Sequence, residues 1–395
     1  MVLENLSKTL PDHCQVIIVA GGQSAGARDR KGAVWAGKVG PSDLYRVDAR
    51  IDRYLLSPLA LLQSLLPWTA SHFYRSYRDR FYIERAASFC AEQKADCIVF
   101  AACPQWAPIL REANPEARLV FFERSDWLRV APQSIEACLA CIDVIICPYT
   151  SLAERIAQRF PVMKARLQVV YDGVDLEAFK PQKIRPRHRI LYVGRISPER
   201  GVHQLVEAFR LLRERYTDAE LLLVGSVERT EREYLLGTPY GRPHHFVSGR
   251  GRYGRRIQDL GRSLRGLLLP GQIEHRELPQ IYATSSLMVM PHLVDSASGL
   301  ALVEAMAVGI PTVATRKGPA PELVQDGRTG LLIEPGRVGE IVAAVEKIFD
   351  SRELAGKMGE AARARAEASF SWETITGRCL EAAGIVEKPD CLRMG

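Results

Sequence analysis

"SLMVMPHLVDSASGLALVEAMAVGIPTVAT", residues 286–315, contains two short apolar runs on either side of a helical pattern that begins near Gly299. The pattern stops at Gly309, and a proline follows at Pro311, which is how many helices end. The runs 286–291 and 311–315 carry no polar alternation. Continuous apolar runs separated by a helix are typical of parallel strands that are buried on both faces. This stretch therefore predicts a strand, a helix and a second, parallel strand.

The same alternation of strand-like and helix-like segments extends over most of the chain. Apolar runs predict strands in the first half at 15–20, 96–101, 117–122, 143–148 and 167–172, and in the second half at 190–194, 219–225, 286–291, 311–315 and 330–334. Helical spacing predicts helices at 83–94, 150–159 and 201–215, and again through the charged segment from 338 to about 385. Strands that alternate with helices predict an α/β protein with parallel sheets.

A polar stretch with two prolines, 175–189, interrupts this alternation and is typical of a linker between domains. A chain of 395 residues is also long enough for two domains. We predict two doubly wound, Rossmann-like domains that face each other across a cleft, the default ligand site in such proteins. The expected boundaries are 1–182, 183–370 and a C-terminal helix within 371–395 that crosses back to the first domain.

The composition is that of a water-soluble enzyme or binding protein. Apolar residues make up 47% and charged residues 25% of the chain, so both domains can form a core. No apolar run is long enough to span a membrane, and the N-terminus lacks a signal-peptide pattern. The nine cysteines are irregularly spaced, which fits a reducing compartment. We expect a cytoplasmic protein. The net charge of +7 favours anionic partners such as phosphates or lipid headgroups.

Two segments fit the alternation less simply. Residues 54–85 combine a leucine-rich run with aromatic and arginine side chains, which is compatible with peripheral contact at the inner face of a membrane or with an amphipathic helix pair packed on the first sheet. Residues 248–266 contain six arginines and one acidic residue, and we expect them to belong to an inserted loop. They lack the aromatic pattern of a nucleic-acid site, so no nucleic-acid partner is expected.

Two arginines stand at a strand end in "ILYVGRISPERGVHQL", 190–205. Arg195 follows the strand, and Arg200 precedes a helix that starts near Gly201. Ligands bind at this edge of open α/β sheets, where helix N-termini add positive charge. Two guanidinium groups there suit a phosphate or diphosphate. An equally weighted alternative is a surface ion pair with Glu199.

The loop and helix of 286–315 add further candidate ligands. The small residues Ser298 and Gly299, followed by Leu300, allow an anionic group to approach the backbone N–H groups at the start of the helix. Glu304 lies in the second turn, on the exposed edge if Leu300 faces the core. Because a carboxylate only accepts hydrogen bonds, it suits the paired hydroxyls of a ribose. The alternative for Glu304, a carboxylate that stabilises the helix dipole, would be expected in the first turn.

The second half of the chain resembles the family 4 glycosyltransferases, retaining sugar transferases of the GT-B fold. The resemblance covers about 165–385 well and the first half only loosely. It rests on five motifs in order, namely "VVYDGVDLEAFKP", "ILYVGRISPERGV", "ELPQIYATSSLMVMP", "GLALVEAMAVGIPTVAT" and "PELVQDGRTGLLIEPG". Each motif is common alone, but the order and spacing are specific.

The resemblance implies transfer of a sugar from a nucleotide diphosphate sugar to a hydroxyl acceptor, with no metal and no cofactor beyond the donor. The leaving phosphate would help to deprotonate the acceptor. Arg195 matches the family's diphosphate-binding arginine, and Arg200 stands where a lysine is usual. Glu304 matches the second glutamate of the family's Glu–seven residues–Glu motif, which binds the ribose. Ile273 falls where the backbone usually meets the base, for which uridine is favoured because such donors are common in the family.

Three features depart from the family pattern. The first glutamate of the motif falls at Ser296, which is not acidic, although a loop one residue longer would let Asp295 replace it in contacting the donor sugar. The first-domain loop keeps Gly21 and Gly22, which are assigned to the donor site, without the family's longer pattern. The usual histidine after a central strand is absent, and Asp126 is the candidate for acceptor contact, or else a helix cap.

The acceptor is predicted only by class, as a glycan, a lipid-linked sugar or a small molecule in carbohydrate biosynthesis. The missing acidic residue at Ser296 leaves an alternative function, a non-catalytic protein that binds nucleotide sugars or serves as a scaffold on the same fold.

Overall fold

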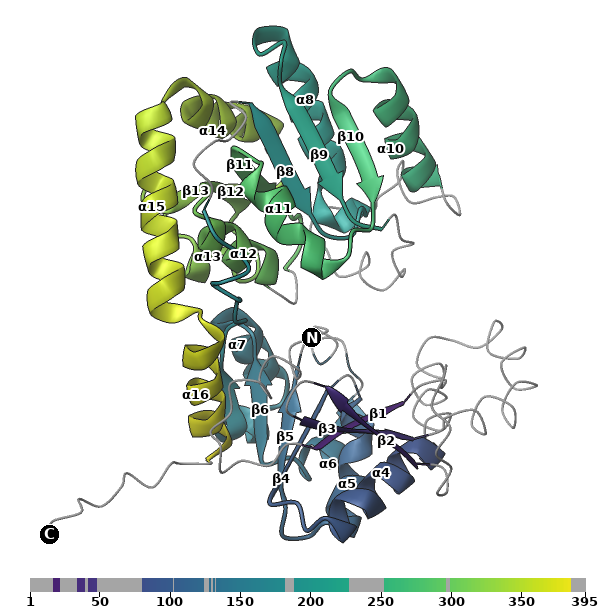
Figure 1. Ribbon diagram of the computed structural model, residues 1–395. Coiled ribbons are helices and arrows are strands. Elements are labelled where there is room, and N and C mark those ends of the chain that lie inside the picture. The colour runs from purple at the N-terminus through teal and green to yellow at the C-terminus, as the bar shows by residue number, and fades with distance from the viewer. Residues whose placement is uncertain are drawn as a thin grey trace, which may run out of the picture. The chain divides into compact units, whose positions relative to one another are not determined.

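A computed structural model describes most of the chain (Figure 1). The described residues are 17–21, 34–39, 42–47, 80–101, 103–123, 128, 131, 133–181, 188–226, 252–295 and 299–384. The chain forms two compact units. Unit 1 comprises 1–148, 152–170 and 375–395, and unit 2 comprises 149–151 and 171–374. The predicted boundaries, 182/183 and 370/371, remain a prediction.

Unit 1 contains two sheets. The first has the order β1-β3-β2, with β1 (Ile17–Gly21) parallel to β3 (Ser42–Val47) and β2 (Val34–Val39) antiparallel to it. The second is fully parallel, with strands β4 (Cys97–Ala101), β5 (Arg118–Phe122), β6 (Val144–Cys147) and β7 (Leu167–Val169) in sequence order. Helices α4 (Arg80–Glu92), α5 (Ala107–Ala113), α6 (Glu136–Leu139) and α7 (Thr150–Arg159) alternate with these strands. The short helices η1 (Pro104–Trp106), η3 (Gln133–Ile135) and η4 (Pro161–Arg166) lie in the connections.

Unit 2 is built on one six-stranded parallel sheet with the order β10-β9-β8-β11-β12-β13. Its strands are β8 (Arg189–Val193), β9 (Glu220–Val224), β10 (Leu267–Gly271), β11 (Leu287–Met290), β12 (Thr312–Thr315) and β13 (Gly330–Ile333). β8 and β11 are neighbours although they are distant in sequence, and Ile190 pairs with Leu287. The strand order therefore reverses between β8 and β11, which is where such folds bind ligands.

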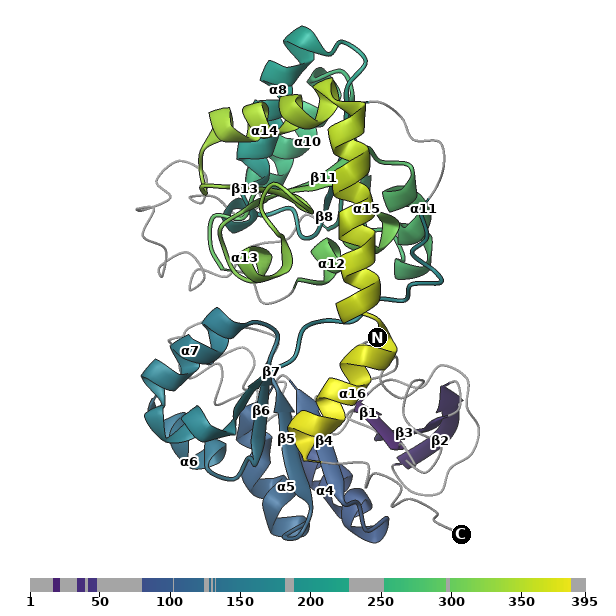
Figure 2. The same cartoon turned by 90° about the vertical axis from the view of Figure 1, so that its left-hand side faces the viewer.

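Helices cover both faces of this sheet (Figures 1 and 2). On one face lie α8 (Val202–Arg215), α10 (Arg252–Ser263) and α14 (Val338–Asp350), and on the other α11 (Leu278–Ala283), α12 (Leu300–Val308), α13 (Ala320–Leu323) and α15 (Arg352–Ser369). The last described helix, α16 (Trp372–Ala383), begins in unit 2 and ends in unit 1. The short helices η5 (Pro198–Arg200) and η6 (His275–Glu277) follow strand ends.

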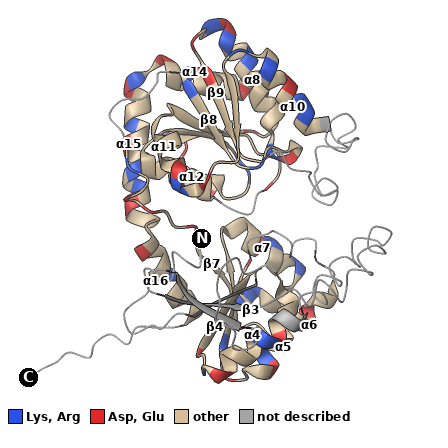
Figure 3. Ribbon diagram, turned by 45° about the vertical axis from the view of Figure 1, so that its right-hand side comes forward, with Lys and Arg blue, Asp and Glu red and all other residues tan. Residues whose placement is uncertain are grey.

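The two cores explain why the strands of unit 2 contain almost only apolar residues. In β8, Ile190 packs with α8 and α14 while the next residue, Leu191, packs with α12 and α15. Because successive side chains of a strand point to opposite faces, a sheet covered on both sides requires apolar residues at every position. Figure 3 shows the consequence for charge, since the Lys, Arg, Asp and Glu residues lie mainly on the helices.

The fold class that the sequence predicts, parallel α/β sheets in two domains, is confirmed. The predicted strands correspond to β1, β4 to β9 and β11 to β13, whereas β2, β3 and β10 were not predicted. The prediction that 248–266 forms a loop is wrong for 252–263, which form α10. Residues 54–79 lie outside the described residues. Within the described part of the chain, no helix combines the length and apolar character that crossing a membrane requires.

Candidate functional site

Two loops of unit 2 leave the carboxyl edge of the sheet from neighbouring strands. One loop follows β8 and contains Arg195 and η5, and the other follows β11 and leads to α12. Both lie where the strand order reverses, so their side chains and amides meet any ligand bound at that edge. Most of the residues that the sequence assigned to the donor site lie on these two loops or on α12.

Arg195 is held through its backbone and its side chain. The hydroxyl of Tyr192, which is fully buried, donates a hydrogen bond of 2.6 Å to the carbonyl oxygen of Arg195. The Arg195 Nη2 atom lies 3.6 Å from Oε1 of Glu199, whose buried carboxylate also accepts a 2.5 Å hydrogen bond from Ser197. The ion pair with Glu199 that was the alternative for Arg195 is therefore present. About a third of the Arg195 side chain (34%) stays exposed, so it can also meet a ligand.

The loops after β8 and β11 are in direct contact with each other. The backbone N–H of Leu293 donates to the carbonyl oxygen of Glu199 over 3.0 Å. Gly201, the residue before α8, has a φ of 69°, and a β-carbon added there would lie 1.9 Å from the carbonyl oxygen of Pro291. Only glycine fits this position, because both the left-handed backbone and the close approach exclude a side chain. The glycine therefore allows η5 and the β11 loop to touch.

His292 lies between the two loops. It is 3% exposed, and Nη1 of Arg200 lies 3.2 Å from its Nε2 atom. Burial lowers the pKa of His292 well below its usual value, and the nearby charges of Arg200 and Arg195 lower it further. Both guanidinium groups therefore lie near the same imidazole. The structure thus brings Arg195 and Arg200 close to one histidine, and their role towards a phosphate stays a prediction.

Glu304 is buried at 2% exposure, so the expectation that it lies on an exposed edge of α12 is wrong. The reason is the second layer of helices, because α11 and η6 pack over this part of α12. Each oxygen of the Glu304 carboxylate has a hydrogen-bond partner there. Oε2 accepts a 2.8 Å hydrogen bond from the hydroxyl of Tyr282, and Oε1 lies 2.7 Å from Nε2 of His275.

His275 connects this buried carboxylate with the surface, since 41% of its side chain is exposed. The hydrogen bond with Glu304 raises the pKa of His275, because the carboxylate favours the charged imidazolium. Burial raises the pKa of Tyr282 well above its usual value, and Glu304 raises it further. The rings of His275 and Tyr282 both pack against Phe179. Glu304 is thus held in one orientation by two donors.

The start of α12 is only partly described. Gly299 precedes the helix and is buried, and Leu300 is its first residue. Asp295, which is half-buried, accepts a 2.6 Å hydrogen bond through Oδ1 from the backbone N–H of Gly318. Ser296 and Ser298 lie outside the described residues. The replacement of the missing glutamate by Asp295 therefore remains a prediction, with one of its oxygens engaged in the loop after β12.

The remaining predicted residues lie elsewhere in the chain. Ile273 follows β10 and is partly buried against the core beside α12. Gly21 is the last residue of β1 in unit 1. Gly22 and Asp126 lie outside the described residues. The roles assigned to these four residues remain predictions.

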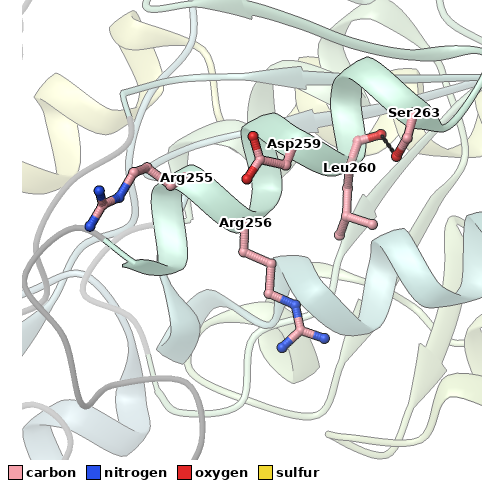
Figure 4. A pocket seen from close by; sticks show the side chains of 5 residues that line it. All are labelled: Arg255, Arg256, Asp259, Leu260 and Ser263. Atoms are coloured by element: carbon pink, nitrogen blue, oxygen red, sulfur yellow. Dashed lines mark hydrogen bonds between the residues drawn. The ribbon is translucent and has the colours of Figure 1, made fainter.

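A hollow of about 640 Å³ lies over α10, and none of the residues assigned to the donor lines it (Figure 4). It is lined by Arg255, Arg256, Asp259, Leu260 and Ser263. Within the described ranges, no group of three or more His, Cys, Asp or Glu side chains is arranged to hold a metal ion.

Three residues of the site were missed by sequence reasoning, namely His292, His275 and Tyr282. Tyr282 and His275 stand in a helical segment, and nothing in their spacing links them to Glu304. His292 could have been noticed, because it directly follows the predicted strand 286–291 and a polar residue there reaches the ligand edge.

The fold defines a class, the doubly wound α/β proteins, in which ligands bind where the strand order reverses. Residues 175–365 match the model of the family described as "Glycosyl transferases group 1". The matched region, residues 175–365, is therefore that of a group 1 glycosyltransferase.

Two curated relatives illustrate the range of the family. Spore coat protein SA of Bacillus subtilis (strain 168) is 22% identical over 333 residues, which cover 78% of this chain and 83% of the relative. MMP alpha-(1->4)-mannosyltransferase of Mycolicibacterium hassiacum is 33% identical over 229 residues, which cover 57% of this chain and 50% of the relative. The chain spans about half the length of several of the curated relatives that it matches.

Among solved structures, HepE of Anabaena in complex with UDP and glucose is similar in fold. The TM-score is 0.62 with 19% sequence identity, and the match covers 77% of this chain and 81% of that one. At this identity the likeness confirms the shared GT-B fold.

Proposed function

We propose that the chain transfers a sugar from a UDP-linked donor to a hydroxyl acceptor, with retention of configuration at the anomeric carbon. The observation that carries the proposal is the convergence of Arg195 and Arg200 on His292 at the carboxyl edge of the unit 2 sheet. Two cations fixed at that edge are suited to a nucleotide diphosphate.

The diphosphate is the leaving group, so negative charge grows on it as the bond to the sugar breaks. Charges that are already in place stabilise that state without reorganisation, which is usually the largest contribution of a protein to such a reaction. Tyr192 fixes the backbone of Arg195, and His292 fixes the guanidinium of Arg200. These residues therefore act on the transition state.

The nucleoside would lie along η6 and α12. Glu304, held by Tyr282 and His275, supplies a carboxylate for the ribose hydroxyls, with His275 at the surface end of the group. Ile273, two residues before His275, would meet the base. A uridine base is supported by HepE, whose structure contains UDP.

The contacts to the sugar and to the acceptor are each assigned to one aspartate. Asp295 would contact the donor sugar beside the loop after β12, and Asp126 the acceptor. A cytoplasmic enzyme with peripheral membrane contact through 54–85 would suit a lipid-linked acceptor. Glycans and small molecules are the other acceptor classes.

A screen of nucleotides tests the donor assignment. UDP, GDP and ADP, each with and without a sugar, are added to the purified chain, and the melting temperature is recorded. A ligand that binds only the folded state adds about 2.7 kcal/mol of stability at 100 times its Kd. We expect stabilisation by UDP and by one UDP-sugar, and little by uridine, which lacks the diphosphate. A chain stabilised by GDP alone would contradict the uridine assignment.

Turnover separates an enzyme from a binding protein on the same fold. The donor found in the screen is incubated with the chain, and released nucleoside diphosphate is measured with and without added glycan or lipid acceptors. Slow release that an acceptor accelerates supports transfer. Tight binding with no release under any condition would favour the scaffold function instead.

A further inference from the structure

We propose that His292 is a positioning residue that holds the Arg200 guanidinium in place for the donor diphosphate by accepting a hydrogen bond at Nε2. This inference rests on the proposed function, because it assigns a role within the same donor site. It adds a residue that the sequence did not single out.

The first observation is the geometry of the pair. Nη1 of Arg200 lies 3.2 Å from Nε2 of His292, and the imidazole is 3% exposed. Arginine remains charged in proteins, and its guanidinium can only donate hydrogen bonds. Nε2 of His292 must therefore be the acceptor, which leaves the ring neutral with its proton on Nδ1.

The surroundings favour this neutral ring. Burial lowers the pKa of His292, and Arg200 and Arg195 add positive charge next to it. The buried carboxylate of Glu199 is engaged with Ser197 and Arg195. Within the described part of the chain, Nδ1 of His292 is buried without a hydrogen-bond partner. An unsatisfied buried donor is destabilising and is uncommon in folded proteins.

The backbone around His292 is fixed from two sides. The hydroxyl of Thr315 donates a 2.7 Å hydrogen bond to the carbonyl oxygen of His292. The backbone N–H of the next residue, Leu293, donates a hydrogen bond to the carbonyl oxygen of Glu199. The imidazole therefore has little freedom to follow Arg200, and Arg200 must align with it. Two guanidinium groups close together repel each other, so without this acceptor Arg200 would be expected to turn towards solvent.

The first experiment compares His292→Ala and His292→Gln with the wild type by calorimetric titration of UDP. Alanine removes the acceptor, and we expect the Kd to rise about tenfold. Glutamine offers an amide oxygen at a similar reach, and we expect it to restore affinity to within about threefold. His188→Ala is the matched control, because His188 is also a mostly buried histidine of unit 2 with one unpartnered nitrogen within the described residues. It should lower the melting temperature without changing the UDP affinity.

A double-mutant cycle with Arg200→Lys tests whether His292 acts through Arg200. We expect His292→Ala to raise the Kd about tenfold when residue 200 is arginine and less than twofold when it is lysine, because the compact ammonium group lacks the planar fork that the imidazole orients. An equal effect in both backgrounds would overturn the inference, and so would a glutamine variant as weak as the alanine variant.

Nitrogen NMR of the histidine rings tests the pair without any nucleotide. We expect His292 to carry its proton on Nδ1 at pH 7 and to remain neutral at pH 5.5. A proton on Nε2, or a charged ring at pH 7, would overturn the inference even if UDP binds. A wild type that binds none of UDP, GDP and ADP would instead overturn the proposed function, and with it the role of Arg200 towards a diphosphate, whatever the tautomer.

Discussion

Gly201→Ala tests the contact between the two ligand-edge loops in the most direct way. Gly201 has a φ of 69°, and a β-carbon there would lie 1.9 Å from the carbonyl oxygen of Pro291 and 2.9 Å from its carbonyl carbon. Both atoms belong to the backbone, so no rotamer change can relieve the overlap. The β11 loop must move by more than 1 Å, since β-carbons essentially never approach other heavy atoms closer than 3.0 Å.

The expected loss of stability has two parts. A left-handed backbone costs a non-glycine residue about 1–2 kcal/mol. Forcing atoms into a packed region costs about 1–3 kcal/mol more. We therefore expect Gly201→Ala to destabilise unit 2 by about 3 kcal/mol. Because Pro291 directly precedes His292 in the chain, the same displacement moves His292 away from Arg200. The affinity for UDP should therefore fall about tenfold or more.

Gly327→Ala is the matched control. Gly327 also has a left-handed backbone, with a φ of 76°, but a β-carbon there would meet nothing within 4 Å. This variant should lose only about 1 kcal/mol and keep its UDP affinity. For a unit of this size, 1 kcal/mol corresponds to a melting-temperature shift of about 2–4 °C. Gly201→Ala should thus melt about 4–8 °C below Gly327→Ala. Equal melting temperatures, or unchanged UDP affinity in Gly201→Ala, would refute the contact.

Three further predictions concern the carboxylates of the site. Glu304→Ala should weaken UDP binding at least tenfold, whereas Tyr282→Phe, which removes one hydrogen-bond donor to that carboxylate, should weaken it only a few-fold. Calorimetric titration measures both affinities. Unchanged affinity in Glu304→Ala would exclude the ribose role. Asp295→Asn keeps an oxygen that can accept the hydrogen bond from the Gly318 N–H, so the melting temperature of this variant should stay near that of the wild type. The rate of sugar transfer should fall about tenfold. Loss of stability with full activity would show that Asp295 has a purely structural role. The raised pKa of His275 means that its ion pair with Glu304 stabilises the fold fully below the unfolded pKa of about 6.5 and is lost as pH rises through the higher folded value. His275→Ala should therefore lower the melting temperature more at pH 5.5 than at pH 9, and a larger loss at pH 9 would contradict the pair.

Sequence patterns predicted much of the fold because burial on both faces of a parallel sheet leaves a clear signal. Runs such as 190–194 and 311–315 contain no charged residue, and they became β8 and β12. The prediction failed where the pattern was weak. α10 contains two glycines and four arginines, so its apolar positions Tyr253 and Ile257 gave little periodicity, yet both are buried.

The sequence by itself determined the strand and helix alternation, and it placed Arg195 and Arg200 at a strand end. Both follow from local chemistry, since apolar runs and chain order are properties of neighbouring residues. Only the tertiary structure decided that β8 lies beside β11, that His292 meets Arg200, and that Glu304 is buried under Tyr282 and His275. These contacts join residues 22 to 97 positions apart, and their partners are chosen by the packing of the whole sheet and its helices.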